Sequence, residues 1–278
     1  MLRGGRESGN VEDLRGRGGR TVALGGGGLG MIVIIVLAIF CGADPSQLLN
    51  QLPAESQVSG PVKSSPTEDD QMKFVAEVLA TTEDAWKVLL PGQMGKQYRF
   101  PKLGVFRGQV GTACGYASSA TGPFYCPADE KIYLDTAFFD ELRKEFRAPG
   151  DFAQAYVIAH EVGHHVQNVT GVMNQVSAMQ KRVSEAQSNN LSVRLELQAD
   201  CYAGVWANYV KKQGRIEVGD IDEAIRAAAA VGDDMIQKRT QGYVVPETFT
   251  HGTAKDRASW FMRGFESGDA RQCNTFGR

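Results

Sequence analysis

A five-residue run, His160-Glu161-Val162-Gly163-His164, has the residue types and the spacing of a metal site. On a helix, residues four apart lie one turn apart on the same face, so the two imidazoles can reach one metal ion together. Glu161 follows the first histidine directly, which places its carboxylate beside the metal, where a base can take a proton from a metal-bound water. The H-E-x-x-H pattern is typical of metalloproteases with this chemistry.

A pattern this short also arises by chance on a solvated helix, so its surroundings matter. Apolar and small residues recur around it at helical spacing and predict a buried stripe on the same helix: Phe152, Tyr156, Ala159, Gly163 and Val166. Ala159 and Gly163 are small enough to let another element come close. A packed helix of this kind favours a metal site over an exposed run of charges.

A catalytic zinc ion needs a third protein ligand and leaves its fourth position to water. In the next strongly helical stretch, residues 192–212, Glu196 and Asp200 lie four residues apart on one face. Glu196 can bind the cation, and Asp200 can accept a hydrogen bond from the second ring nitrogen of a ligand histidine. An exposed acidic face is the alternative for this pair, but the first motif favours the metal site.

The two motifs in this order resemble those of the glutamate-type zincins. More narrowly, the chain is similar to the bacterial putative neutral zinc metallopeptidase family, the YpfJ-like group, from about Asp69 to the C-terminus and in a membrane segment ahead of it. The matching segments are C-G-Y-A-S-S-A-T-G-P-F-Y-C-P at 114–127, A-H-E-V-G-H-H-V-Q at 159–167, E-L-Q-A-D-C-Y-A-G at 196–204 and F-T-H-G-T at 249–253. The resemblance implies one zinc ion held by His160, His164 and Glu196, with Glu161 as catalytic acid/base and Asp200 supporting a ligand.

Two further histidines need an interpretation. His165 points about 100° away from His164 around the helix, too far to join the same metal. His251 lies in Thr250-His251-Gly252-Thr253, which resembles the H-P-[ST] segment of membrane-associated zinc peptidases, with glycine in place of proline. A carbonyl under attack develops negative charge that needs a positioned donor. The candidates for that donor are His251, Arg257, Tyr202 and Tyr243, and the alternative for His251 is a capping or packing role.

These residues predict a zinc peptidase, most simply an endopeptidase, that acts on a peptide or protein substrate. Zinc would lower the pKa of its bound water and polarise the scissile carbonyl, while Glu161 takes the proton and later delivers it to the departing amine. One alternative is a peptidase restricted to short peptides. Another is a metal-stabilised, membrane-anchored peptide-binding protein without turnover, which would have no need of a base at Glu161.

The first part of the chain predicts a membrane anchor. Residues 1–21 are rich in arginine and residues 22–41 are uncharged and largely apolar, long enough for one transmembrane helix. The arginines would keep the N-terminus in the cytosol of a bacterium and place the catalytic domain outside the cytoplasmic membrane. A cleaved signal peptide and a lipoprotein anchor at Cys41 are the alternatives; no A-x-A site follows, and the bulky Phe40 is unfavourable for lipoprotein processing.

The rest of the 278 residues predict one sizeable domain. Residues 42–70, rich in Ser, Pro and acidic residues, predict a flexible linker, and residues 71–278 an α+β, zincin-like metallopeptidase domain, mostly helical with a small sheet. We expect a helix from Asp69 or Asp70, strands at 105–111 and 131–135, and a helix at 138–146. An edge strand could align an extended peptide. A net charge of −2 and a pI near 6.1 give no indication of nucleic-acid binding.

The five cysteines fit an oxidising compartment. Cys114 and Cys126 bracket a turn-rich loop that suits a disulfide. Cys201 and Cys273 are the plausible second pair, which would tie the helix of Glu196 to the C-terminus, and Cys41 would stay unpaired. A second metal cluster is the alternative use, but no C-x-x-C spacing supports it.

Overall fold

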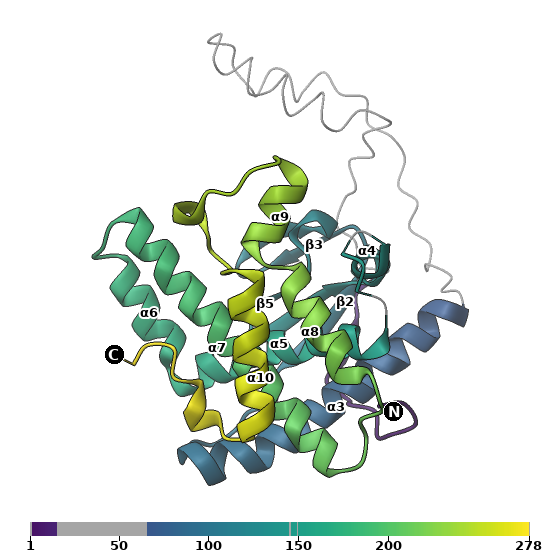
Figure 1. Cartoon of the computed structure of the whole chain (residues 1–278). Helices are drawn as coiled ribbons and strands as arrows, with labels where there is room; N and C mark the ends of the chain where they lie inside the picture. The colour runs from purple at the N-terminus through teal and green to yellow at the C-terminus, as the bar shows by residue number, and fades with distance from the viewer. Residues whose placement is uncertain (1, 16–65, 145, 149, 278) are drawn as a thin grey trace, which may run out of the picture.

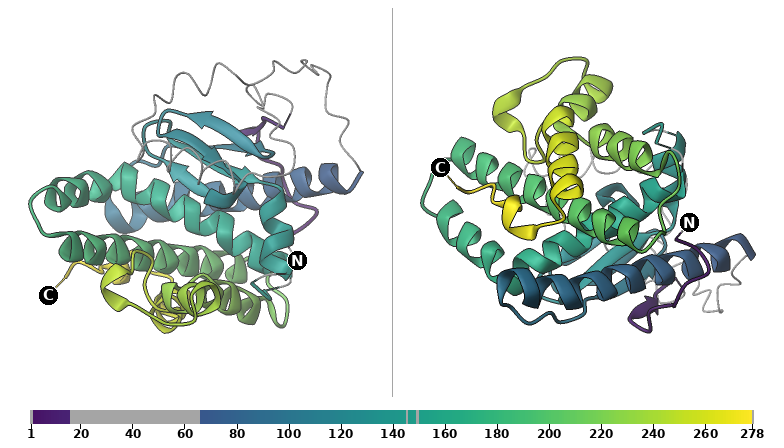
Figure 2. Two further views of the ribbon diagram at one scale, coloured as in Figure 1. Left: turned by 90° about the horizontal axis from the view of Figure 1, so that it is seen from above. Right: turned by 60° about the horizontal axis from the view of Figure 1, so that its bottom comes forward.

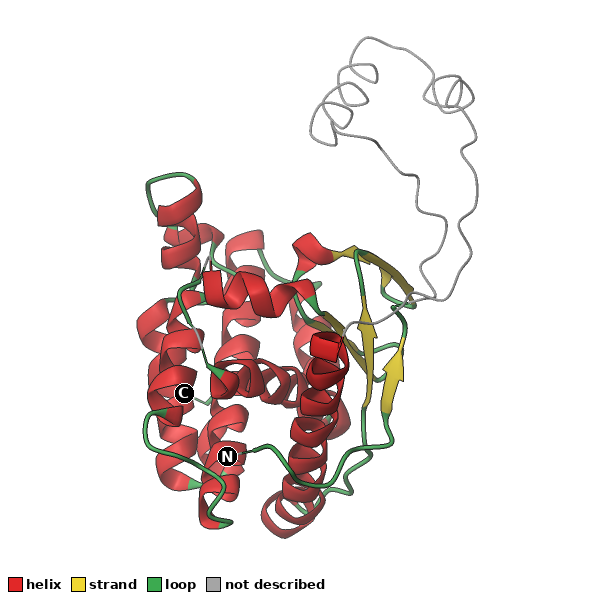
Figure 3. Cartoon of the chain, turned by 90° about the vertical axis from the view of Figure 1, so that its right-hand side faces the viewer, coloured by secondary structure: helices red, strands yellow, loops and turns green. Residues whose placement is uncertain are grey.

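The computed structural model describes residues 2–15, 66–144, 146–148 and 150–277. A small sheet lies on one side of these residues, and helices make up most of the rest (Figure 1, Figure 3). This arrangement confirms the predicted α+β class. The expected transmembrane helix at 22–41 and most of the expected linker at 42–70 lie outside the described residues. Within the described ranges, no helix combines the length and the apolar character needed to cross a membrane.

The helices that carry the two motifs lie below the sheet in successive layers. Figure 2 shows the sheet, then α5 (Asp151–Thr170), then α7 (Glu185–Lys212) and finally α10 (Ala254–Ser267). The long helix α3 (Pro66–Met94) runs alongside α5 and contacts α7 as well. Because α5 is covered by the sheet on one side and by α7 on the other, most of its side chains are buried.

Among the described residues, the sheet has four strands in the order β1 (Val11–Asp13), β2 (Lys102–Phe106), β6 (Lys131–Asp135) and β5 (Phe124–Cys126). β1, β2 and β6 run parallel, and β5 is an antiparallel edge strand. The strand expected at 131–135 is confirmed. The strand expected at 105–111 is divided, because Gly108 has a φ of 78° and turns the chain from β2 into a hairpin of β3 (Gln109–Thr112) and β4 (Gly115–Ser118).

Residues 2–15 belong to the folded body, in contrast to the separate N-terminal segment expected at 1–21. β1 pairs with β2, and the side chain of Leu2 is buried in the main core. The buried carboxylate of Glu83 in α3 accepts hydrogen bonds from the side chains of Arg6, Ser8 and Asn10. The only apolar residue of β1 is Val11, so the alternation that marks a strand is too short to recognise there.

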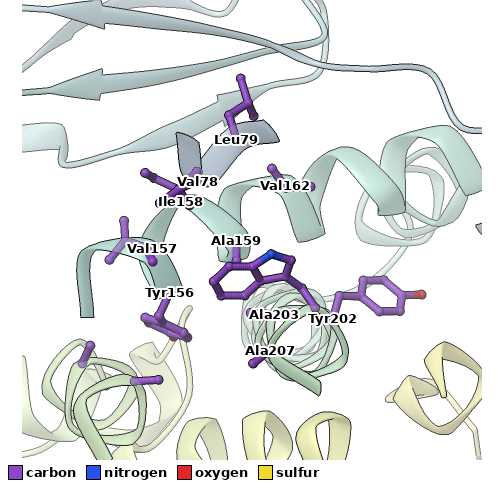
Figure 4. Close-up of a cluster of buried hydrophobic side chains, with 14 of the residues drawn as sticks. Val78, Leu79, Tyr156, Val157, Ile158, Ala159, Val162, Tyr202, Ala203 and Ala207 are labelled. Atoms are coloured by element: carbon purple, nitrogen blue, oxygen red, sulfur yellow. The ribbon is translucent and has the colours of Figure 1, made fainter. Parts of the chain in front are cut away.

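The core joins α3, α5 and α7 through large aromatic residues and small ones (Figure 4). Trp206 of α7 stacks on Phe152 of α5, and its indole N–H donates to Thr81 of α3 at 3.0 Å. Trp86 meets Tyr202 edge to face. These contacts fix the three helices relative to one another, which is what a site shared between α5 and α7 requires.

Shorter elements complete the fold: α4 (Ala137–Lys144), α6 (Val172–Gln180), α8 (Asp220–Ala230), α9 (Asp233–Thr240) and the 3-10 turns η1 (Ser119–Thr121), η2 (Pro246–Thr248) and η3 (Ala270–Cys273). α4 is the helix expected at 138–146. α7 begins before the expected residue 192, because Ser184 caps it by accepting a hydrogen bond from the backbone N–H of Gln187.

Both expected disulfides are present. Cys114 and Cys126 join the β3–β4 hairpin to β5, and Cys201 and Cys273 join α7 to η3. Cys41 lies outside the described residues. The first bridge closes a short loop beside the sheet, whereas the second spans 72 residues and secures the C-terminal end of the chain against the helix of Glu196.

Candidate metal centre

Three side chains from two helices converge at one point. His160 and His164 of α5 and Glu196 of α7 place ligand atoms within 4.8 Å of one another. The Nε2 of His160 lies 3.2 Å from Oε2 of Glu196, and the Nε2 of His164 lies 3.3 Å from its Oε1. The two imidazoles and the carboxylate expected from the motifs are therefore brought together, although Glu196 is 36 residues away from His160 in the chain.

A glycine makes this meeting of the two helices possible. Gly163 lies between the two histidines, and a Cβ placed on it would come 2.9 Å from the backbone oxygen of Ala199. Real Cβ contacts are not that short, so only glycine allows α5 and α7 to approach this closely. The small residue noted in the sequence thus has a specific task, which is to bring Glu196 within reach of both imidazoles.

The second ring nitrogen of His160 is held by a buried charged network. Its Nδ1 lies 2.8 Å from Asp200, the partner expected from the E-x-x-x-D spacing. Asp200 also accepts two hydrogen bonds from the guanidinium of Arg257, at 2.8 and 3.0 Å, and one from the hydroxyl of Tyr156 at 2.5 Å. Arg257, one of the candidate oxyanion donors, is buried in this network, and its guanidinium also lies 3.6 Å from Oε2 of Glu196 and 3.4 Å from Nε2 of His160, so its N–H groups are directed at Asp200 and at the ligand side chains.

The second ring nitrogen of His164 has a partner that the two motifs did not indicate. Its Nδ1 lies 2.9 Å from the amide oxygen of Gln167, a fully buried residue. Gln167 follows His164 by three residues, so the two side chains share one face of α5. That i,i+3 spacing, with glutamine inside the matched segment, was the signal that could have revealed it.

Glu161 is buried beside the three converging side chains. Burial raises the pKa of its carboxyl above the ordinary glutamate value, although the nearby His164 and His160 oppose the rise. A carboxylate whose pKa is raised towards neutrality is better matched to accepting and returning a proton. Its location and its environment both suit the general base expected from the motif.

The donor set fits a zinc ion. Burial disfavours the charged form of Glu196, but His164 and His160 outweigh it and hold the pKa of the carboxyl well below the usual value, so the group is ionised. Burial lowers the pKa of His160, yet the charge and the hydrogen bond of Asp200 raise it to about 10, so a proton competes with the metal ion for this imidazole. Both Nε2 atoms face the shared point while both Nδ1 atoms are engaged elsewhere, which matches the two-histidine, one-carboxylate set of catalytic zinc sites.

His251 lies before α10 and is held by a residue that the sequence did not indicate. Its Nδ1 is 3.0 Å from Asp233, whose other oxygen accepts the backbone N–H groups of Thr250, His251 and Gly252. The imidazole is half exposed and close enough to Glu196 to respond to its charge. The hydrogen bond to Asp233 raises the pKa of His251, although burial opposes it. No sequence motif links Asp233 to His251, since only the tertiary fold brings them together.

The remaining candidates lie away from the converging ligands. His165 points to the other side of α5, as expected, where its Nδ1 meets the hydroxyl of Tyr125 at 2.9 Å and its Nε2 donates to the backbone oxygen of Arg99 at 2.7 Å. Tyr202 is buried in the core against Trp86 and is therefore not an oxyanion donor. Tyr243 is exposed on the segment after α9, and no described contact ties it to the site.

Comparison with known proteins gives a consistent result. A family model described as "Putative neutral zinc metallopeptidase" matches residues 1–276. The uncharacterized protein YpfJ of Escherichia coli K12 is 49% identical over 284 residues, covering 99% of this chain and 98% of its own length. An uncharacterized protein of Mycobacterium bovis is 45% identical over 258 residues, covering 86% of this chain and 85% of its own. No solved structure matches significantly. On this evidence, the chain belongs to the putative neutral zinc metallopeptidase family.

Proposed function

We propose that this protein is a zinc-dependent peptidase, with His160, His164 and Glu196 as the ligands of a single ion. One observation carries the proposal: two imidazole Nε2 atoms and a carboxylate converge while a buried glutamate lies beside them. A zinc ion bound there would polarise the scissile carbonyl and lower the pKa of a water molecule. The family to which the chain belongs supports the same reading.

The chain's own residues divide the remaining work. Glu161 takes a proton from the attacking water and returns it to the departing amine. His251, held by Asp233, donates a hydrogen bond to the oxygen on which negative charge develops. Asp200 orients His160 through its Nδ1. Burial of Glu161 supports this role over that of a metal-stabilised binding protein, since an unused buried carboxylate would only cost stability.

The substrate we propose is an extended peptide aligned along β5. This strand is an edge of the described sheet and packs against α5, the helix of the two histidine ligands, where its Tyr125 meets His165 and Asn168. A peptide could pair with this edge through its backbone, as in other cases of strand addition. The Cys114–Cys126 bridge secures the end of β5 and would keep that edge in place.

The test is zinc analysis of the full chain combined with digestion of a peptide library, with Glu161→Gln as the comparison. The variant should keep its zinc and lose about 10²- to 10⁴-fold in kcat/KM, because it removes the base and leaves the ligands. Equal cleavage by the variant would refute the assignment of Glu161. Stoichiometric zinc without any cleavage by the unaltered chain would favour the peptide-binding alternative.

Attachment to a membrane through the apolar residues 22–41 is also part of the proposal, with the domain on the extracytoplasmic side. Two disulfides support an oxidising compartment for residues 114–273. Fractionation of cells that express the full chain tests the attachment, since loss of residues 22–41 should release the protein from the membrane fraction. Equal membrane association without these residues would count against it.

A further inference from the structure

A relay of buried amide hydrogen bonds, formed by Gln167 and Gln198, runs from His164 to Cys273 near the C-terminus. The amide oxygen of Gln167 faces Nδ1 of His164 at 2.9 Å. The amide nitrogen of Gln167 donates to the backbone oxygen of Leu195 at 2.7 Å and to the side-chain oxygen of Gln198 at 3.2 Å. The amide nitrogen of Gln198 in turn donates to the backbone oxygen of Cys273 at 2.9 Å.

The acceptors in this chain determine the orientation of both amides. The backbone oxygens of Leu195 and Cys273 can only accept hydrogen bonds, so each must face an amide N–H₂ group. Gln167 then has only its oxygen left for His164, and that oxygen requires a proton on Nδ1. The Nε2 of His164 consequently presents its lone pair towards Glu196, which is the form that binds a metal.

The end of the relay that is farthest from His164 is held covalently. Cys273, whose backbone oxygen ends the relay, is bonded to Cys201 on α7, next to Asp200 in sequence. Thr275 adds a hydrogen bond to the backbone oxygen of Arg194 at 2.7 Å. Gln198 therefore connects α5 to a C-terminal segment that cannot drift away from the ligand helix.

We propose that Gln167 and Gln198 are positioning residues for His164, a proposal that relies on the proposed function for the identity of the metal. Their effect is to hold one imidazole tautomer and one ring orientation through neutral groups that do not titrate. The relay begins at a ligand side chain and ends at the Cys201–Cys273 bridge, so this disulfide contributes to metal affinity.

Zinc affinity of the full chain, measured by competition with a chelator, tests the relay. Gln167→Met should weaken binding about 10- to 100-fold, because the ring of His164 loses its fixed partner. Gln167→Glu, which can still accept from Nδ1, should recover part of the loss. Gln198→Met should have a smaller effect in the same direction, since it acts through Gln167.

Gln180→Met is the matched control, because its amide also links two helices through Ser188 and Ser192 but touches no histidine. Unchanged affinity in Gln167→Met with unaltered zinc binding by the parent chain would overturn the relay alone, whereas a parent that binds no zinc would overturn the proposed function. If Gln167→Met does not fold, the Nδ1 proton of His164 in the zinc-loaded parent decides: slow exchange with solvent supports the relay, and fast exchange refutes it.

A second inference comes from the N-terminal residues. Gly4, Arg6 and Ser8 all make hydrogen bonds to α3, and the backbone N–H of Leu103 in β2 donates to the oxygen of Asn10. A guanidinium nitrogen of Arg15 also lies 3.8 Å from a carboxylate oxygen of Asp69 in α3, so the described residues just before and just after residues 16–65 lie close together.

Segments that pack into one folded body must lie on the same side of a bilayer. A single crossing between residues 15 and 66 would separate β1 from β2 and leave Glu83 buried without its partners. We infer that residues 2–15 and the domain lie on the same side of the membrane. This location is incompatible with the one-span topology expected from the arginine pattern.

Labelling with a membrane-impermeant maleimide in cells that express the full chain tests this topology. Glu7→Cys and Val218→Cys, each in a Cys41→Ser background, introduce thiols at exposed positions of the N-terminal segment and of the domain. We expect both positions to label alike, with labelling after lysis as the control for reactivity. Labelling of Val218→Cys together with protection of Glu7→Cys in intact cells would restore the single-span topology and overturn the inference.

Discussion

The two histidines of the site differ in the chemistry that supports them. Behind His160 lies a buried charged network, in which Asp200 is shared with Arg257 and Tyr156. Behind His164 lies a neutral relay of two glutamines that ends at a backbone oxygen. A charged support is strong but depends on every partner, because a lost partner leaves a buried charge uncompensated. A neutral support contributes less energy and does not change with pH.

The largest expected effect is on the charged side. Arg257→Met should lower the free energy of unfolding by about 3–5 kcal/mol, because it leaves the carboxylate of Asp200 buried without its cation. Denaturant unfolding of the full chain measures this loss. Arg263→Met on the same helix is the control, since that residue is exposed, its guanidinium lies over Trp260 and it should contribute no more than about 1 kcal/mol. Equal losses of unfolding free energy in the two variants would show that the buried network around Asp200 stabilises the fold no more than an exposed arginine does.

Removing each disulfide in turn separates the effect of the relay on zinc affinity from a general loss of stability. Loss of Cys201–Cys273 as a double alanine variant should cost about 4 kcal/mol, against about 3 kcal/mol for Cys114–Cys126, since loop-closure entropy grows with the 72- and 12-residue separations. Only the first variant should also weaken zinc binding, because the relay ends at Cys273. Equal zinc affinities in both double variants, measured by chelator competition, would disconnect the bridge from the metal centre.

The spacing of the two helices affects both supports at once. Gly163→Ala should destabilise the fold by about 1–3 kcal/mol and weaken zinc binding, because the added methyl group forces α5 away from Ala199. Gly92→Ala, near the end of α3 where a Cβ would meet nothing within 4 Å, should instead stabilise by about 0.5–1 kcal/mol. Thermal unfolding with and without zinc distinguishes the two variants. A Gly163→Ala variant as stable as the parent would disprove the close-approach explanation.

Sequence alone indicated the part of the site that depends on local spacing. His160, His164 and Glu161 follow from one helical turn, and Glu196 with Asp200 follows from another. Asp233 and the link from Gln198 to Cys273 could not be predicted, because they join segments that only the tertiary fold brings together. β1 was missed for a related reason, since its short, mostly polar segment becomes a strand only by pairing with β2.

The smallest expected effect concerns pH and the half-exposed His251. The hydrogen bond to Asp233 raises the pKa of His251, with burial and Arg257 opposing it and Glu196 supporting it. A raised pKa means that the protonated, donating form persists above the ordinary histidine value and is lost as pH rises through the folded pKa. Asp233→Asn should therefore move the basic limb of the kcat/KM profile to lower pH, with a loss that grows with pH and little change in zinc affinity.

Because the basic limb of kcat/KM reports groups of the free enzyme, the zinc-loaded full chain with a cleaved peptide is the system to measure. A basic limb unchanged in Asp233→Asn would mean that His251 takes no part in the reaction as a proton-bearing group.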